Sequence, residues 1–389
     1  MHHIVTYGGW YQRTTLHLSE IYEFFFSGKS SIDGLNPEQL SRLYQQLDLA
    51  SVSRETSYLE YVQAKTKQGI SVRYYEDGLY ILQITASEVS DASDILQDYF
   101  EKQFGPAISY LFSKGAPTPK VLANIKTSHS TVIGLISANP AKEKIDENVY
   151  GQIYSQITSA QITVYKTPNH IFVAATDKYN QVVADIIEVQ IFFREFKDQL
   201  EKYLQIHRRI WEEISAIKEQ KSIPGSQIRH IRSQLDGYQK TINLISNRIN
   251  QMGTYISTRA SIAKQLDLED YLKTLFQYKF ETLADTLGYI KEIWSMTKEY
   301  LASAIQIMVE VENQSLNTSL RSLQILTSIG VVSGVLGLLA RQEWPKVTSY
   351  GFLYFLILIA ISWLVNAIIS LVFARLKYRL KFTERSQNL

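Results

Sequence analysis

The sequence predicts an α+β domain that is followed by a long helical hairpin, a long single helix and two C-terminal membrane helices. Short apolar segments bounded by turn residues alternate with helical stretches up to residue 177. Amphipathic helical patterns then continue without strand signals, and two long runs without a charged residue close the chain. The 389 residues suffice for several domains, and the absence of cysteine excludes disulfides, cysteine nucleophiles and thiolate metal sites.

Residues 1–177 form the predicted α/β domain. Residues 71–75 and 79–84 flank a Glu76-Asp77-Gly78 turn and are expected to pair as a hairpin. A second hairpin is expected around Pro168-Asn169. The strands expected there are 161–166 and 171–175, a further strand is expected at 131–137, and helices are expected at 16–26, 37–47, 57–66 and 92–112.

Residues 178–266 are predicted to form a long helical hairpin. Two amphipathic runs, 178–221 and 226–266, are separated by the breaking sequence Ser-Ile-Pro-Gly at 222–225. Asp267 is then a suitable N-cap for a stalk helix over 267–321. Because no proline follows until Pro345, this helix is expected to approach ~100 Å at 1.5 Å per residue and to enter the membrane unbroken.

An apolar stripe in steps of three and four runs along this stalk, which is typical of a helix that packs against other helices. The stripe consists of Ile290, Trp294, Thr297, Leu301, Ala304, Met308 and Val311. Its partner is either the chain's own hairpin or the same helix in other copies. Continuity with the first membrane segment favours an oligomeric stalk.

The two charge-free runs are 322–340, with 19 residues, and 347–374, with 28 residues. About 20 helical residues cross a bilayer, so each run predicts a transmembrane helix, with a short external loop at 341–346. The alternative is a pair of buried helices in a soluble core. An uninterrupted stretch of 28 uncharged residues argues against that alternative.

Charge predicts the orientation of these spans. From Arg321 onward, eight Lys and Arg against two acids give +6, whereas residues 1–320 carry −4. The basic tail at 375–389 therefore marks the cytoplasmic side. No N-terminal signal peptide is seen, so we expect a multi-pass protein of the cell (inner) membrane with both termini in the cytoplasm.

Enzyme signatures are missing from the sequence. Gly28-Lys29-Ser30 ends like a phosphate-binding loop, but Glu23 stands where the first glycine of that motif is required. The seven histidines show no metal-ligand spacing. We therefore expect no enzyme, no catalytic residue and no cofactor. The net charge of +2 predicts no nucleic-acid partner.

The order of elements resembles the CorA family of divalent-cation channels, in which five chains surround a pore formed by the stalk and first span. The family ends its first span with Gly-x-x-Gly-Met-Asn. Gly334-Val335-Leu336-Gly337-Leu338-Leu339 is similar to this motif at both glycines. The tail also resembles the family's basic collar. The collar residues are Arg375, Lys377, Arg379 and Lys381.

The chain departs from the family at the outer mouth of the pore. Leu338 and Leu339 stand where the family has methionine and asparagine, so a side-chain oxygen for a hydrated cation is missing there. The external loop offers one acid, Glu343. The tip of the hairpin, acidic in many members, is rich in arginine and lysine here.

The resemblance implies which residues of the stalk and first span line the pore. These are Asn313, Leu316, Leu320, Thr327, Gly330 and Gly334. Rings of Leu316 and Leu320 are expected to close the pore by dewetting, and Asn313 to hydrogen-bond hydrated ions. The alternative role for Asn313 and Thr327 is hydrogen bonding between helices. The outer mouth consists of Gly337, Leu338, Leu339 and Glu343, and the residues of any metal site stay unknown.

Two functional hypotheses follow. The first is a CorA-like homopentamer that conducts Mg²⁺ or another divalent cation and is gated by tilting of the stalk. The second is a ligand-gated membrane effector on the same scaffold, controlled by a small molecule such as a nucleotide signal bound to the cytoplasmic domain, as in CorA-like proteins that accompany CRISPR systems. An inert membrane-anchored scaffold is a third possibility. The expected partners are other copies of the chain, the lipid bilayer and that small-molecule ligand.

Overall fold

The computed structural model describes residues 3–11, 16–115, 129–159, 161–220 and 222–339, nine positions between 353 and 368, and a strand at 377–379. The chain divides into two compact units. Unit 1 comprises Met1–Ile206 and Leu244–Glu292, and unit 2 comprises His207–Asn243 and Ile293–Leu389. Each unit contains part of each of the three long helices, which span Asn180–Lys218, Ile228–Gln265 and Phe280–Leu339.

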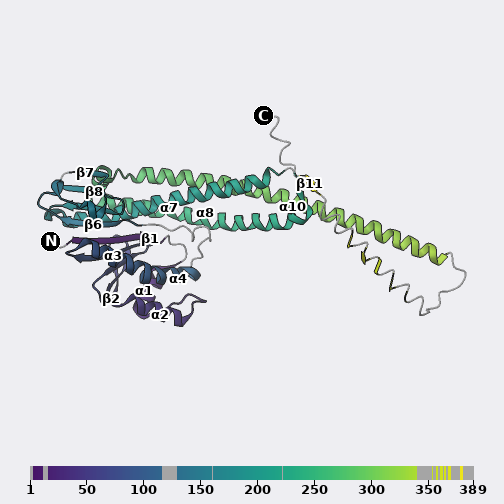
Figure 1. The fold of residues 1–389 in the computed structure, drawn as a ribbon, viewed down its shortest axis with the longest axis horizontal. Coiled ribbons are helices and arrows are strands. Elements are labelled where there is room, and N and C mark those ends of the chain that lie inside the picture. The colour runs from purple at the N-terminus through teal and green to yellow at the C-terminus, as the bar shows by residue number, and fades with distance from the viewer. Residues whose placement is uncertain are drawn as a thin grey trace, which may run out of the picture. The chain divides into compact units, whose positions relative to one another are not determined.

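Among the described residues of unit 1, nine strands form one sheet in the order β2-β3-β4-β5-β1-β6-β9-β8-β7. Figure 1 labels β1, β2, β6, β7 and β8 of this sheet. Neighbouring strands are antiparallel except β6 and β9, which are parallel. The strands are β1 (His3–Trp10), β2 (Leu49–Thr56), β3 (Glu60–Thr66), β4 (Ser71–Tyr75), β5 (Leu79–Ala86), β6 (Thr131–Ile136), β7 (Ser155–Ser159), β8 (Ile162–Lys166) and β9 (His170–Ala175).

Helices of the N-terminal half cover one face of this sheet and bury its main apolar core. They are α1 (Leu18–Ser27), α2 (Pro37–Leu47), α3 (Val89–Tyr99) and α4 (Gly105–Gly115), with a π-helical turn, Phe100–Phe104, joining the last two. A four-residue helix, α6 (Glu147–Tyr150), precedes β7. Alternate residues of β1, such as Val5 and Tyr7, point into this core.

The opposite face of the sheet packs against α7 (Asn180–Lys218). Glycine is required in β1, because a Cβ on Gly8 would lie 2.8 Å from the Tyr80 carbonyl oxygen and 3.1 Å from Ile191 of α7. Trp10 stacks on Phe196 of α7 with ring centroids 5.2 Å apart. These contacts let α7 lie close against the centre of the sheet.

Arg194 connects α7 to the sheet by hydrogen bonds to backbone carbonyl oxygens. Its guanidinium donates to the carbonyl oxygen of Gly8 at 3.1 Å and to that of Ser130 at 2.9 Å. It also pairs with Glu195, which contacts His129 Nδ1 at 2.8 Å. Burial alone would raise the pKa of Glu195, but His129 and Arg194 outweigh burial and hold it below its usual value.

Arg259 of α8 (Ile228–Gln265) joins three elements of unit 1. Its guanidinium contacts the Asp77 carboxylate at 2.7 and 3.1 Å and that of Glu188 on α7 at 2.8 Å. Its side chain is 1% exposed, and that of Asp77 is 4% exposed. Burial alone would lower the pKa of Arg259, but the two carboxylates more than reverse this effect and raise it. Arg259 therefore joins α8 to the β4–β5 turn and to α7.

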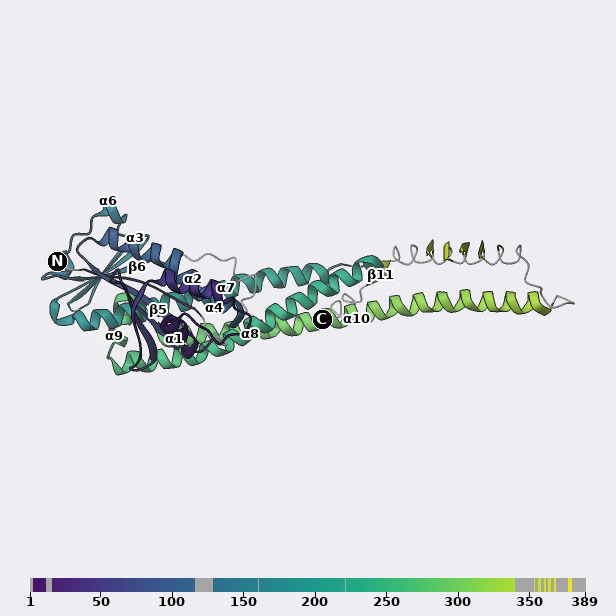
Figure 2. The ribbon, with the colours of Figure 1, turned by 90° about the horizontal axis from the view of Figure 1, so that it is seen from below.

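The described chain also contains a third long helix, with the short elements that lead into it, and a second, two-stranded sheet. A short helix, α9 (Glu269–Tyr271), leads into a π-helical turn, Leu272–Phe276, and then into the 60-residue helix α10 (Phe280–Leu339). In unit 2, β10 (Ser222–Pro224) lies between α7 and α8 and pairs with β11 (Lys377–Arg379). Figures 1 and 2 show the second half of α10 continuing beyond the α7–α8 turn of unit 2.

The predicted stripe on α10 is buried within the single chain. Trp294, Thr297, Leu301, Ala304, Met308 and Val311 of unit 2 are each less than 5% exposed, as is Ile290 of unit 1. In unit 2, Trp211 of α7 stacks on Tyr300 of α10 at 4.4 Å, and His207 meets Trp294 edge-on at 5.8 Å. The stripe therefore packs against the chain's own hairpin. The interpretation that it packs against the same helix in other copies is wrong.

Most predicted elements of the N-terminal half are confirmed. The 71–84 hairpin is β4 and β5, the 131–137 strand is β6, and the second hairpin is β8 and β9. The helices at 16–26, 37–47 and 92–112 are also present, the last as α3, the π-helical turn and α4. The helix predicted at 57–66 is wrong because Val62, Ala64 and Thr66 alternate onto the buried face of a strand, β3.

The stalk helix begins later than predicted. Asp267 is not an N-cap, because its φ of 53° places it in the left-handed region, and Gln277 has φ 60°. The chain turns at both residues and enters α10 at Phe280. The prediction failed because neither turn contains a glycine or a proline.

We predict that Arg259→Leu lowers the free energy of unfolding by about 3–5 kcal/mol, because the buried Asp77 carboxylate loses its partner. Chemical denaturation of the purified full chain measures this change. Arg54→Leu is the matched control, since it breaks an exposed pair with Glu60 and is expected to cost less than about 1 kcal/mol. Equal losses in the two variants would contradict the prediction.

Candidate functional site

The described residues predicted to line a pore lie on one side of α10. Asn313, Leu316, Leu320, Thr327, Gly330 and Gly334 follow one another at separations of three, four and seven residues, and all six are exposed. Leu316 is 51% and Leu320 57% exposed, although both are large and apolar. This side of α10 is called the outward face.

The outward face points away from the core of unit 2. Asn313 follows Val311, the last residue of the buried stripe, by two positions, which is a rotation of about 200° around a helix. Leu316 is turned from Val311 by about 140° on the same measure. In unit 2, α10 therefore packs one face inside the chain, and its other face is exposed among the residues that the structure describes.

The glycines of the outward face pack against no side chain in the part of the chain that the structure describes. A Cβ built on Gly330 or Gly334 meets no atom of the described residues within 4 Å. Thr327 donates a hydrogen bond from its Oγ1 to the carbonyl oxygen of Gln324 at 3.0 Å. Glycine at 330 and 334 is thus not needed for packing against the described parts of the chain.

The predicted outer mouth lies at the end of α10. Gly337, Leu338 and Leu339 form its last turn, and Glu343 lies outside the described residues, as does most of the second predicted span. Among the described residues, no helix combines the length and the apolar composition that crossing a bilayer requires. The described part of the chain also holds no group of three or more His, Asp or Glu side chains arranged for a metal ion.

Two of the four predicted collar residues fall in strand β11. Lys377 aligns with Pro224 and Arg379 with Ser222 in an antiparallel ladder with β10. Arg375 and Lys381 lie outside the described residues. The ladder places Lys377 and Arg379 beside the segment between α7 and α8, an association that the sequence analysis did not predict.

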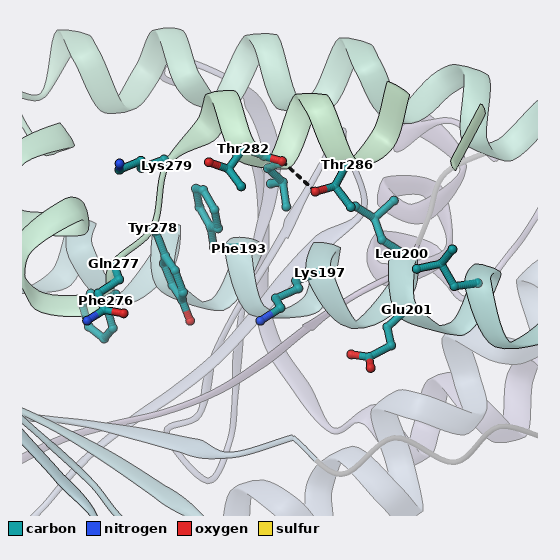
Figure 3. A pocket seen from close by; sticks show the side chains of 12 residues that line it. Phe193, Lys197, Leu200, Glu201, Phe276, Gln277, Tyr278, Lys279, Thr282 and Thr286 are labelled. Carbon is teal, nitrogen blue, oxygen red and sulfur yellow. Dashed lines mark hydrogen bonds between the residues drawn. The ribbon is translucent and has the colours of Figure 1, made fainter. Parts of the chain in front are cut away.

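A cavity of about 470 Å³ lies between α7 and the start of α10 in unit 1 (Figure 3). One wall is formed by α7, with Phe193, Lys197 and Leu200, and the other by α10 residues such as Thr282. The loop at residues 276–279 closes one end. The remaining lining residues are Glu201, Leu204, Phe276, Gln277, Tyr278, Lys279, Leu283 and Thr286.

Aromatic stacking holds the loop beside this cavity. Tyr278 lies face to face with Phe193 at 4.5 Å and also stacks on Phe276 at 5.5 Å. The backbone N–H of Gln277 donates to the carbonyl oxygen of Lys273, and that of Tyr278 to Leu272, each at 3.1 Å. The loop carrying Lys279 is therefore fixed by packing and by hydrogen bonds.

The sequence analysis did not single out the cavity residues. Lys197 and Glu201 lie within a long amphipathic helix, where charged side chains on the solvent face are expected. The turn at Gln277 carries no glycine or proline that would have marked a loop. The one available signal is the cluster Phe276-Gln277-Tyr278-Lys279-Phe280, which has three aromatic residues in five positions.

No protein-family model matches the sequence, and no curated protein sequence is similar to it. Among solved structures, the chain is similar to the complete structure of the CorA magnesium transporter from Methanocaldococcus jannaschii. The sequences are 12% identical, the match covers 63% of this chain and 92% of the other, and the TM-score is 0.28. The sequence identity and the TM-score are both low, so any functional proposal must rest on the chain's own residues.

The β10–β11 ladder gives a direct test, because the chain has no cysteine of its own. Ser222→Cys combined with Arg379→Cys is expected to form a disulfide on mild oxidation, since paired residues of an antiparallel ladder have Cα atoms about 4.5–5.5 Å apart. Electrophoresis without reductant detects the cross-link as a mobility shift. Ser222→Cys with Lys377→Cys, two residues out of register, is the control and should cross-link far less.

Proposed function

We propose that the chain is one subunit of a CorA-like homopentameric channel for divalent cations, with Mg²⁺ as the first candidate. The observation that carries the proposal is the outward face of α10. It combines an exposed amide, Asn313, with two exposed leucines at the next helical positions, Leu316 and Leu320. In a ring of identical helices, each subunit would present this same face to the central axis.

The two faces of α10 support self-association. The buried stripe is already covered by the chain's own hairpin, so contacts with other copies are left to the remaining surface. Exposed apolar side chains in a row, such as Leu316 and Leu320, favour burial against another surface. The space around Gly330 and Gly334 would let neighbouring helices approach closely.

The sequence supports a membrane location for this channel. The runs at 322–340 and 347–374 contain no charged residue, and the tail beyond them is basic. We propose that these runs cross the cell (inner) membrane and that both termini lie in the cytoplasm. The β10–β11 pairing fits this topology, because it requires the tail to return to the side of the hairpin turn.

In the proposed pore, polar side chains bind the hydrated cation and apolar rings close the pore by excluding water. Five Asn313 amides would hydrogen-bond a cation through its water shell, and five copies each of Leu316 and Leu320 would form apolar rings that exclude water when narrow. Tilting of α10 would widen these rings. Because Leu339 supplies no side-chain oxygen at the outer mouth, the polar step within the membrane would be Thr327. No catalytic role is proposed for any residue.

The test of this function is dye-reported Mg²⁺ entry into liposomes that contain the purified chain, with no added ligand. We expect entry well above that of empty liposomes, and a native mass of five chains in detergent. A monomer or dimer would overturn the pore, because α10 would then have too few copies to enclose one.

We predict that Leu316→Asn and Leu320→Asn each raise resting ion leak by about tenfold or more, since a polar ring at the constriction holds water. The same liposome assay measures the leak. Met296→Asn is the matched control, because Met296 is 55% exposed on α10 but lies on a different side of the helix. A leak unchanged in both leucine variants would mean that the outward face does not line a pore.

A second candidate is a ligand-gated membrane effector on the same scaffold. It is favoured by the lack of a side-chain oxygen at Leu339 and by the cavity beside the start of α10. In this case a correctly folded pentamer would conduct nothing in the assay above until a small molecule is added. Conduction without ligand would exclude it.

A further inference from the structure

Another cavity of unit 1 lies beside the outer strands of the sheet, and we call it the Asp185 cavity. Its volume of about 320 Å³ falls within the range of roughly 300–1,000 Å³ that small-molecule sites occupy. Its walls include the turn between β2 and β3 with Tyr58, strand β4 with Tyr75, helix α7 with Asp185 and helix α8 with Ile262. Four separate parts of the chain thus enclose a space large enough for a small molecule.

The charged groups around the Asp185 cavity leave one carboxylate without a cation. Asp77 holds the Arg259 guanidinium at 2.7 and 3.1 Å, and Glu188 Oε1 contacts the same guanidinium at 2.8 Å. Glu188 Oε2 accepts from Arg73 at 3.3 Å. Asp185 forms no ion pair with any residue that the structure describes. Two guanidinium groups therefore face three carboxylates, and the surplus negative charge belongs to Asp185.

Asp185 lies in this charged network but receives little stabilisation from it. Its carboxylate is half-buried and accepts one long hydrogen bond, at 3.3 Å, from the neutral amide of Gln181. Burial and the neighbouring Glu188 carboxylate raise the pKa of Asp185, and the amide of Gln181 and the charge of Arg73 offset this only in part. A cation from outside the chain would supply the stabilisation that the ionised carboxylate lacks.

The rest of the lining is mainly aromatic and aliphatic. Tyr58 is 52% exposed, so much of its ring can cover a ligand, whereas Leu59 and Ile262 are buried and give the cavity an apolar surface. Tyr61 packs against Tyr75 with ring centroids 5.2 Å apart, which holds the aromatic wall in place. The faces of tyrosine rings attract cations and also pack against apolar groups. The lining therefore suits a ligand that has both a positive charge and an apolar body.

We infer that the Asp185 cavity binds a small organic amine, whose ammonium group lies against the Asp185 carboxylate and whose body lies against Tyr58, Leu59 and Ile262. The inference goes beyond the proposed channel and does not require conduction. An ammonium group donates hydrogen bonds to a carboxylate, and its apolar body uses walls that offer a metal ion no ligand. Among the described residues, no three His, Asp or Glu side chains are arranged to hold a metal ion there.

Ligand-observed NMR titration of the full chain in nanodiscs of uncharged lipid tests the inference, with empty nanodiscs as the blank. The probes are phenethylamine and hexylamine, the uncharged phenethyl alcohol and hexanol of the same shapes, and magnesium chloride. At least one amine is expected to bind at least about tenfold more tightly than its alcohol, because only the ammonium group makes a charge-assisted contact with Asp185. Amines that bind no more tightly than their alcohols overturn the inference. Binding of Mg²⁺ but of neither amine also overturns it.

Asp185→Asn separates this site from non-specific binding, because it removes the charge and keeps the shape of the side chain. It is expected to weaken the bound amine by about tenfold or more and to leave the Kd of the matching alcohol unchanged. Asp198→Asn is the matched control. Asp198 is another half-buried aspartate of α7 whose pKa is raised by burial, but it does not line the Asp185 cavity. An unchanged amine Kd in Asp185→Asn overturns the inference.

Tyr58→Ala tests the body of the ligand without changing the charged network. It is expected to weaken the bound amine by about threefold, through the loss of the aromatic contact. Tyr154→Ala is the control, because Tyr154 is 67% exposed and does not line the cavity. Equal amine affinity in the two tyrosine variants would mean that the amine binds elsewhere, which also overturns the inference.

These titrations are independent of ion flux. If an amine binds but liposomes show no Mg²⁺ entry with or without it, the channel fails and the site stands. If Mg²⁺ enters the liposomes but neither amine binds, the site fails and the channel stands.

Discussion

The buried contact between Arg259 and Asp77 is the constraint on which the architecture of unit 1 depends. Asp77 occupies a tight turn completed by Gly78 at φ 89°, and its Oδ1 also accepts a hydrogen bond from the backbone N–H of Leu79. Both charges lie almost entirely out of water, which is stable only while they satisfy each other. Because Glu188 of α7 shares the same guanidinium, the contact joins the sheet to both long helices, and α7 supplies one wall of the cavity.

The sequence predicts this region unevenly, for identifiable physical reasons. The β4–β5 and β8–β9 hairpins were predictable because Asp77-Gly78 and Pro168-Asn169 are strong local turn signals. Strand β1 was missed although it lies inside the sheet, since Gly8-Gly9 is typical of a turn. Gly8 is there for a tertiary reason, the approach of Ile191, and a contact between residues 183 positions apart leaves no local pattern.

At the candidate site, too, features with a local sequence pattern were predictable and features set by tertiary contacts were not. Periodicity along α10 predicted a buried stripe correctly but could not name its partner, because a heptad fits the chain's own hairpin and other copies equally well. The outward face, from Asn313 to Gly334, was placed by resemblance to a family, and in the structure it is exposed. The cavity was not predictable, since its lining residues on α7 and at the start of α10 are about 80 positions apart in the sequence and line one cavity only because the chain turns at Gln277.

The short ladder between β10 and β11 also constrains how the chain can assemble. Three residue pairs close a loop of about 150 residues, and the entropy cost of that closure is at least as large as the net gain from so few backbone hydrogen bonds. The ladder therefore cannot nucleate folding. It must form late, after the intervening segments have brought residue 377 back to the hairpin turn. Its presence thus reports that Lys377–Arg379 has reached the segment between α7 and α8, and without it the backbone of Ser222–Pro224 would lose its strand partner among the described residues.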